Sequence, residues 1–73
     1  MSSDDIVRWR EKLGMTRTQF ARELDVSYQT VVRWENGELT PRNPRIMEYA
    51  LRYLAFRAMD QERAGAGGAA GDG

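Results

Sequence analysis

Four side chains in the middle of this 73-residue sequence could contact the edges of nucleic-acid bases, three of them through hydrogen bonds and one through an apolar contact. They are Tyr28, Gln29, Val32 and Arg33. Two neighbours are followed by two more one turn later, so in a helix all four share one face. A helix inserted end-on into the major groove of DNA needs such groups in its first two turns, because the base edges there carry a distinguishable pattern. Polar residues on an outer helix face are more commonly just solvated, so these four alone do not establish a function.

Two short helices joined by a tight turn would have to position this face. Thr16 and Gln19 form a capping box, in which the Thr16 hydroxyl binds a free backbone N–H and the Gln19 amide reaches back to the cap. A helix therefore begins there, and Asp25 interrupts its apolar pattern. The apolar residues that share one face of this helix are Phe20, Ala21 and Leu24.

A second helix follows at once. Ser27 is a good N-cap for it, and Asn36 with Gly37 supplies a left-handed stop at the far end. Only about two residues separate the two helices, so we expect them to cross steeply. The second helix then presents the four candidate residues on its outer face.

The flanking segments also predict helices. Ser3 can cap a helix from Asp4 to Leu13, which Gly14 ends. Residues 38–45 contain two prolines and no periodicity, so we expect a loop there. Asn43 followed by Pro44 has the form of a cap with an N1 proline, and residues 44–60 contain no helix breaker, so one long helix should begin there.

The last helix is apolar nearly all round and must be covered on more than one side. We expect one side to close the core over the first three helices, through Ile46, Ala50 and Leu54. The residues left needing another partner are Met47, Leu51, Tyr53, Phe56 and Met59. A second copy of the chain is the economical partner, so these five predict a dimer interface, although a small domain can also leave some aromatic residues exposed.

Length and composition indicate one small domain near the size at which a single core becomes marginal. Residues 1–63 form the expected domain, and residues 64–73, which lack branched and aromatic side chains, form an expected disordered tail. The sequence has no cysteine, which excludes disulfides and thiolate metal sites, and no apolar run of signal-peptide or membrane-span length. We therefore expect a cytoplasmic, nucleoid-associated protein.

The formal net charge is zero, but the charges are unevenly spread. The segment from Ile6 to Arg57 contains ten basic and six acidic residues, so its net charge is +4. The other acidic residues lie near the two ends of the sequence. This modest excess is compatible with phosphate binding and would be weak support for it without a motif.

The ordered set of motifs resembles the Cro/repressor-type, lambda repressor-like helix-turn-helix family. The resemblance covers residues 4–55 and rests on TRTQFARELDVS from Thr16, on TVVRWENG from Thr30, and on Ile6, Arg10 and Leu13. It implies an all-α domain of four helices, possibly five, with a long C-terminal helix. Relatives often break that last segment at a glycine, and residues 44–60 of this sequence contain none.

The resemblance also assigns roles to individual residues. It places Tyr28, Gln29, Val32 and Arg33 against base edges, with Gln29 suited to adenine, Arg33 to guanine and Val32 to a thymine methyl group. Arg17 stands where similar repressors carry a glutamine that grips a phosphate. The full set of expected phosphate contacts is Thr16, Arg17, Ser27, Thr30, Asn36, Arg42 and Arg45.

Family members often pair an arginine of the first helix with the glutamate of the E-N-G segment. Arg10 and Glu35 occupy those positions, so the resemblance predicts a partly buried, bidentate ion pair between them. Trp34 should lie in the core. Trp9 falls off the Ile6–Leu13 face and could pack against the C-terminal helix or lie at an interface.

Catalysis is not expected, because the sequence has no histidine, no cysteine, no glycine-rich loop after a strand and no suitable carboxylate pair. No metal, cofactor, membrane or small-molecule substrate is indicated. The expected partners are double-stranded DNA and a second copy of the chain, as in a homodimeric repressor that controls a phage or mobile-element operon. The alternative is a protein-interaction module, such as an antitoxin or an adaptor, whose C-terminal helix binds a partner protein.

Overall fold

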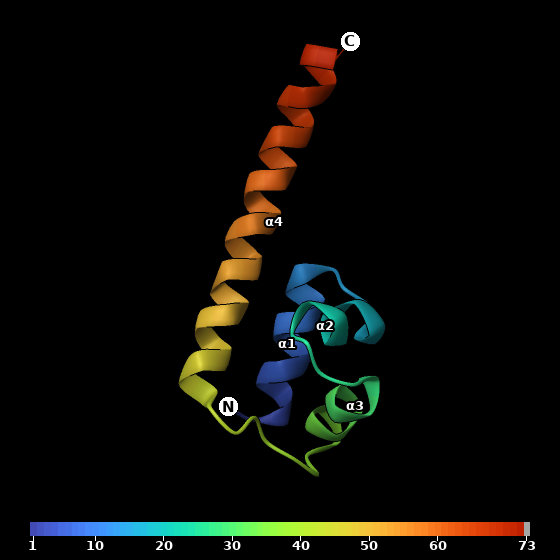
Figure 1. The fold of residues 1–73 in the computed structure, drawn as a ribbon, viewed down its shortest axis with the longest axis vertical. Helices are drawn as coiled ribbons and strands as arrows, with labels where there is room; N and C mark the ends of the chain where they lie inside the picture. The colour runs from blue at the N-terminus through green and yellow to red at the C-terminus, as the bar shows by residue number, and fades with distance from the viewer. Residues whose placement is uncertain (73) are drawn as a thin grey trace.

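A computed structural model of the chain contains four α-helices, shown in Figure 1: α1 (Ser3–Leu13), α2 (Arg17–Glu23), α3 (Tyr28–Asn36) and α4 (Pro44–Asp72). The structure describes the backbone of residues 1–72 and the side chains of residues 1–60. No strand occurs within residues 1–72, which confirms the expected all-α class. The last segment is one continuous helix, so the four-helix alternative is the correct one.

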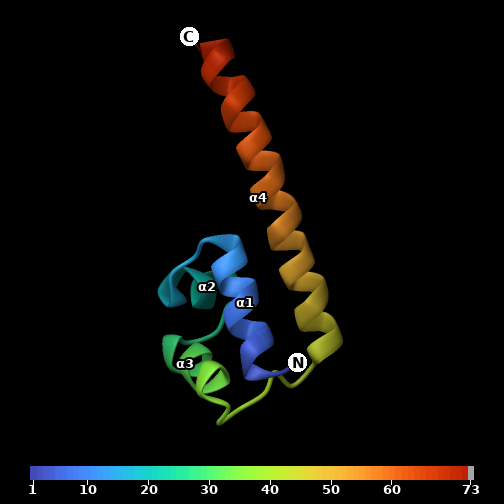
Figure 2. The same cartoon turned by 180° about the vertical axis from the view of Figure 1, so that it is seen from behind.

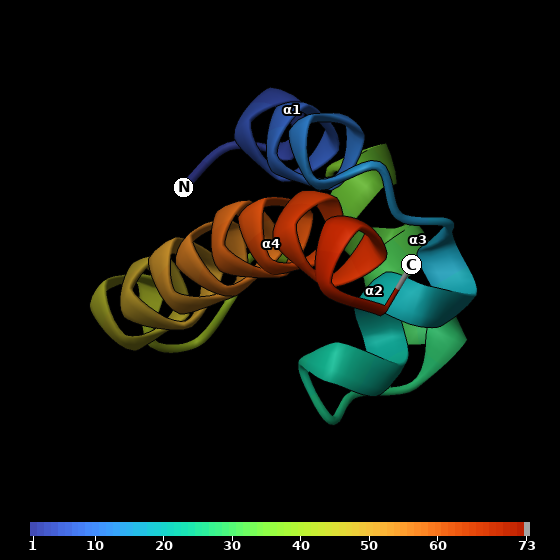
Figure 3. The same ribbon diagram turned by 90° about the horizontal axis from the view of Figure 1, so that it is seen from above.

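Helices α1 to α3 form a cluster, and the first half of α4 packs along it while the second half runs past it (Figures 1 and 2). Seen from above, the cluster surrounds one side of α4, with α1 and α2 at opposite ends of that arc (Figure 3). The side chains from residue 61 onward are outside the described residues. The expected boundary between a domain at 1–63 and a tail at 64–73 lies in this part of the chain, so that division stays a prediction.

Helix α1 begins one residue earlier than expected, with Ser2 rather than Ser3 as its N-cap. The Ser2 hydroxyl accepts from the Asp5 N–H at 3.2 Å, and the Asp5 carboxylate accepts from the Ser2 N–H at 3.0 Å. Ser3 could not form this reciprocal pair, because the residue three positions after it is the apolar Ile6. Gly14 ends the helix in the left-handed region, as expected.

Both motif helices begin where the sequence predicts, and α3 also ends as expected, whereas α2 ends at Glu23, one residue before the expected last position Leu24. The capping box of Thr16 and Gln19 starts α2, and the Ser27 hydroxyl accepts from the Thr30 N–H to start α3. Gly37 ends α3 with φ of 80°. Asp25, in the turn between α2 and α3, also adopts a left-handed conformation, with φ of 57°.

The core lies between the helix-turn-helix pair, α1 and the first turns of α4. Trp34 belongs to it, as expected, with 6% of its surface exposed. Its buried apolar residues are Ile6, Phe20, Ala21, Val31, Trp34, Met47, Leu51 and Leu54. Every helix contributes to this core, so the position of α3 depends on the packing of the whole domain.

The face that α4 turns to the core agrees with the predicted one only in part, because Leu54 is buried as expected but Ala50 is half-buried. Met47, Leu51 and Leu54 are buried, at a spacing of four and three residues, whereas Ile46 is 62% exposed. Because α4 is apolar nearly all round, its hydrophobic pattern could not determine which stripe would face inward. Met47 and Leu51 therefore belong to the core of the chain, and the prediction that they lie in a dimer interface was wrong.

Candidate nucleic-acid interface

The four candidate residues of α3 lie together on the molecular surface. Tyr28 is 51% exposed, Gln29 and Arg33 are exposed, and Val32 is half-buried. All four line one shallow depression of about 260 Å³, together with Asn36 and Glu38. In Figures 1 and 2, α4 runs along the other side of the cluster from α3. The N-terminal turns of α3 are therefore open to a ligand as large as a duplex.

Glu38 is a member of this surface that the sequence did not suggest. The left-handed Gly37 turns the chain back, so that the Glu38 N–H donates to the Arg33 carbonyl at 2.9 Å. The Glu38 carboxylate then lies 3.9 Å from the Arg33 Nε, and both side chains are more than half exposed. An acidic group at the rim lowers the positive potential of the depression and competes for Arg33.

The expected ion pair between Arg10 and Glu35 is present, but it is not bidentate. The Arg10 Nε donates to Glu35 Oε2 at 2.6 Å, while the Arg10 Nη1 donates to the Met15 carbonyl at 3.1 Å. The Glu35 side chain is 5% exposed and that of Arg10 is 18% exposed. Arg10 thus ties α3 both to α1 and to the segment that leads into α2.

The second oxygen of Glu35 is bound by Arg17, which the sequence assigned only to phosphate contact. The Arg17 Nε donates to Glu35 Oε1 at 2.9 Å, and the Arg17 side chain is 48% exposed. The pKa of Arg17 is raised, chiefly by this hydrogen bond, with a smaller contribution from Tyr28. Arg17 therefore lies beside α3 as a half-exposed charged group that is bound to Glu35.

Glu35 is held in its charged form by its two partners. Burial by itself would raise the pKa of this carboxyl, but the hydrogen bonds and charges of Arg10 and Arg17 outweigh burial and keep the pKa below its usual value. The carboxylate joins α1, α2 and α3 at the point where the candidate face of α3 must be held steady.

The other expected phosphate contacts are dispersed. The Thr16 and Ser27 hydroxyls accept from the backbone as N-caps, and Thr30 lies 2.9 Å from the Ser27 hydroxyl. Of the remaining residues, Asn36 lines the α3 depression, whereas Arg42 and Arg45 do not. Arg42 borders a larger groove beside α4, and Arg45 borders a groove next to Trp9.

Trp9 lies beside the start of the C-terminal helix, near one of its two expected locations. It is half-buried against the core and shares its groove with Pro44, Arg45 and Glu48 of α4. The Lys12 ammonium lies 5.1 Å from the centroid of its ring. Trp9 thus takes no part in the α3 surface.

Three residues of the predicted dimer interface are exposed on α4. They are Tyr53 at 60%, Phe56 at 70% and Met59 at 62%. Ile46 and Tyr49 extend this apolar surface toward the start of the helix. Arg57 forms an ion pair with Glu23, at 2.7 Å between Nη2 and Oε1, and its guanidinium lies 5.9 Å from the centroid of the Tyr53 ring.

The described part of the chain contains neither a cluster of metal-ligating side chains nor a helix that could span a membrane. None of its acidic side chains gather in a group of three or more that could hold a metal ion. None of its helices combines the length and the apolar character needed to span a bilayer.

Comparisons with known proteins agree with this geometry. The model of the helix-turn-helix family matches residues 6–53. The chain is also similar to the antitoxin HigA-2 of Vibrio cholerae serotype O1, with 39% identity over 46 residues, which are 63% of this chain and 44% of the relative. The match thus spans less than half the length of that relative. No solved structure gives a significant match.

Proposed function

The chain belongs to the helix-turn-helix family of DNA-binding regulators, and from this premise we propose that it is a sequence-specific, homodimeric repressor. Each copy would insert the N-terminal half of α3 into the major groove at one half of an inverted repeat. Two half-sites read by such a dimer lie about 34 Å apart, which is one helical turn of DNA. The simplest action is to cover a promoter, including that of its own operon in a phage or mobile element.

The observation that supports this proposal best is the shared exposure of the α3 residues around one depression. Gln29 can bond both polar atoms of an adenine edge, and Arg33 can do the same with guanine. Val32 can contact a thymine methyl group, and Tyr28 lies one turn before it at the leading end of the helix. The surface thus combines a donor–acceptor amide, a fork of donors and an apolar contact.

The second part of the proposal concerns the DNA backbone. Arg17 is held beside α3 by the hydrogen bond from its Nε to Glu35, and its half-exposed guanidinium can also contact a phosphate. Thr16, Ser27, Thr30 and Asn36 lie at the ends or flank of the motif helices and can add hydrogen bonds there. Such contacts set the register of the protein on the duplex and carry no sequence information.

The dimer is proposed to form through the exposed apolar face of α4, centred on Tyr53, Phe56 and Met59. Large exposed apolar surfaces of this kind commonly mark protein interfaces. A dimer would also supply apolar burial that a domain of this size lacks by itself.

The reading of bases is tested by comparing Arg33→Ala with Arg17→Ala, using binding titrations on a selected operator and on random DNA. Arg33→Ala should cost ~1–3 kcal/mol on the operator and relax discrimination at one base position, whereas Arg17→Ala should weaken all sequences alike and lower the salt slope by about one. Arg52→Ala on α4 is the matched control. If Arg33→Ala weakens operator and random DNA equally, direct readout by Arg33 is refuted.

The dimer is tested by sedimentation of the parent and of Phe56→Glu. We expect the parent to sediment as a dimer and Phe56→Glu as a monomer, because a buried carboxylate at the interface would be costly. Thr18→Glu, which adds the same charge on α2, should leave the mass unchanged. If the parent sediments as a dimer and Phe56→Glu has the same mass, another surface pairs the two copies.

The second candidate function is a protein-interaction module whose α4 face binds a partner protein. It is favoured by the name of the relative, an antitoxin, together with the exposed face of α4. Both candidates use the same surface, so the sedimentation experiment separates them. A parent that stays monomeric at high concentration leaves this face free for a different protein and favours the module.

A further inference from the structure

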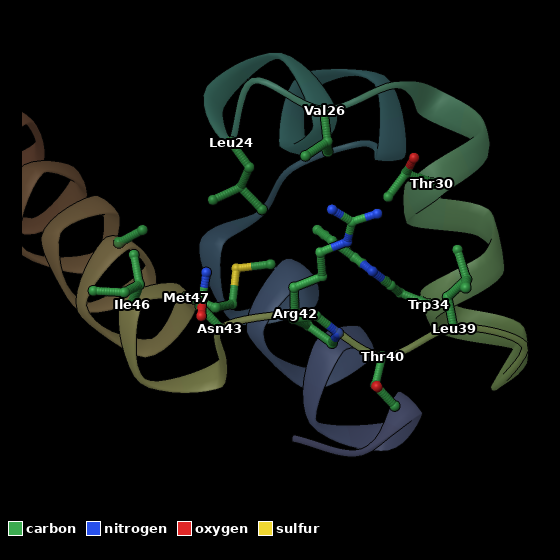
Figure 4. Close-up of a pocket in the computed structure, with 12 residues that line it drawn as sticks. Leu24, Val26, Thr30, Trp34, Leu39, Thr40, Arg42, Asn43, Ile46 and Met47 are labelled. Atoms are coloured by element: carbon green, nitrogen blue, oxygen red, sulfur yellow. The ribbon is translucent and has the colours of Figure 1, made fainter.

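A groove with a larger volume than the α3 depression lies beside the proposed base-reading surface. It has a volume of about 590 Å³ and lies between the turn after α2, the flank of α3, the loop after α3 and the first turns of α4 (Figure 4). Small-molecule sites commonly have volumes of about 300–1,000 Å³. Thr30 and Trp34 are the α3 residues that line it, and both lie off the face of the DNA-reading residues.

The walls of this groove are mainly apolar. They are formed by Leu24, Val26, Trp34, Leu39, Ile46 and Met47. Leu39 is 42% exposed and Ile46 is 62% exposed, so large aliphatic surfaces remain uncovered at its rim. The proposed DNA contacts make no use of these surfaces.

Among the described residues, Arg42 is the single charged one that lines the groove. Figure 4 shows its side chain reaching from the loop across the groove toward Val26 and Thr30. No ion pair joins it to another side chain among residues 1–60. Thr30, Thr40 and Asn43 supply the other polar groups of the lining. The groove therefore combines apolar walls with one available guanidinium and contains no acidic side chain among the residues that line it.

We propose that this groove binds a small amphipathic carboxylate, with the carboxylate on Arg42 and the apolar part against Trp34 and Ile46. A guanidinium binds a carboxylate through two parallel hydrogen bonds, and such charge-assisted bonds are stronger than neutral ones. A neutral apolar ligand would leave Arg42 without a partner, and a cation would be repelled by it. A phosphodiester would leave the apolar walls unused.

The position of the groove gives such a ligand a way to affect the DNA surface. A molecule bound there touches α3 through Trp34 and α4 through Ile46 and Met47. It would therefore contact both the helix that reads bases and the helix that carries the exposed apolar face. Binding itself requires no DNA, so it can be measured on the free protein and does not depend on the proposed repressor activity.

The experiment uses the two tryptophans, of which only Trp34 lines this groove. In the Trp9→Phe protein the fluorescence of Trp34 reports on the groove alone, and calorimetry on the parent gives an independent binding constant. Octanoate is the probe, with octanol and octylamine as neutral and cationic controls of the same length. We expect a saturable change with octanoate and affinities about tenfold lower for both controls, because these lack the charge-assisted bond.

Arg42→Gln should weaken octanoate binding about tenfold and leave octanol binding unchanged. Arg45→Gln, which removes a charge from a different groove, is the matched control and should have no effect. The proposal is overturned if octanoate gives no saturable change, if octylamine binds as well, or if Arg45→Gln has the same effect as Arg42→Gln. A Trp34 signal that changes with protein concentration and is insensitive to octanoate would identify a second copy as the occupant and would likewise overturn it.

Discussion

The substitution Arg10→Met should destabilise this domain strongly, because it removes one partner of a buried carboxylate. Glu35 keeps 5% of its side chain exposed and would retain only the hydrogen bond from Arg17. The substitution would also remove the hydrogen bond from Arg10 Nη1 to the Met15 carbonyl, which holds the segment between α1 and α2 in place. Met fills much of the volume of the arginine stem, so the change tests polar contacts rather than packing.

The magnitude follows from the burial of Glu35. Removing one partner from a buried pair costs ~3–5 kcal/mol, and the remaining bond from Arg17 places this case near ~3 kcal/mol. Domains of this size are stable by roughly 3–9 kcal/mol in total, so the loss is a large share. It corresponds to a fall in Tm of roughly 12–24 °C.

The assay is thermal and urea unfolding followed by circular dichroism, with Arg17→Met as the matched comparison. Arg17 is half exposed, so Arg17→Met should cost clearly less than Arg10→Met. Adding Glu35→Met to Arg10→Met should restore part of the lost stability, because the poorly compensated carboxylate is then gone. The reasoning is refuted if Arg10→Met melts within a few degrees of the parent, or if the two arginine variants lose equal stability.

Four further outcomes follow from the structure. Asp25→Gly should stabilise the domain by about 0.5–1 kcal/mol in urea unfolding, because glycine adopts the left-handed conformation without a side-chain penalty, and a lower stability would count against strain at this turn. Leu51→Ala should cost ~2–5 kcal/mol, whereas Phe56→Ala should change the stability of the dilute protein by less than ~0.5 kcal/mol, and the opposite order would show that α4 docks by a different face. The pKa of Glu35 is lowered in the folded protein, so the ionised carboxylate contributes stability at pH values above its usual pKa of 4.5. This stability is lost as the pH falls through the folded pKa, and the stability of Glu35→Gln in acid unfolding should therefore depend less steeply on pH in that range than the stability of the parent. Glu38→Gln should raise DNA affinity severalfold in binding titrations, since it removes a carboxylate from the rim of the α3 depression, and an unchanged affinity would place Glu38 outside the DNA contact.

The helix boundaries could be predicted because they depend on neighbours in sequence. The capping box of Thr16 and Gln19, the N-cap Ser27 and the left-handed Gly37 each act within one turn of chain. At the start of α1 the N-cap is Ser2 and not the expected Ser3, because only Ser2 has a reciprocal capping partner, Asp5, three residues later.

The exposed face of α3 could be predicted for a similar reason. Its inner residues Val31 and Trp34 are apolar and its outer residues are mostly polar, so the helical period separates the two faces. The pairing of Arg10 with Glu35 came from the family resemblance, and the structure confirms it. The second arginine on Glu35 could not be anticipated, because Arg17 reaches it only after α2 has crossed α3.

What the sequence alone determined about this protein is therefore local: its helical class, the start and end of each motif helix, and the polar face of α3. Two other features were decided by the tertiary structure. The stripe of α4 that faces the core is Met47, Leu51 and Leu54, because a helix that is apolar nearly all round is oriented only by docking against the other three. The groove containing Arg42 exists because the loop after α3 and the start of α4 are brought beside the turn after α2, and no period along the chain encodes that meeting of distant segments.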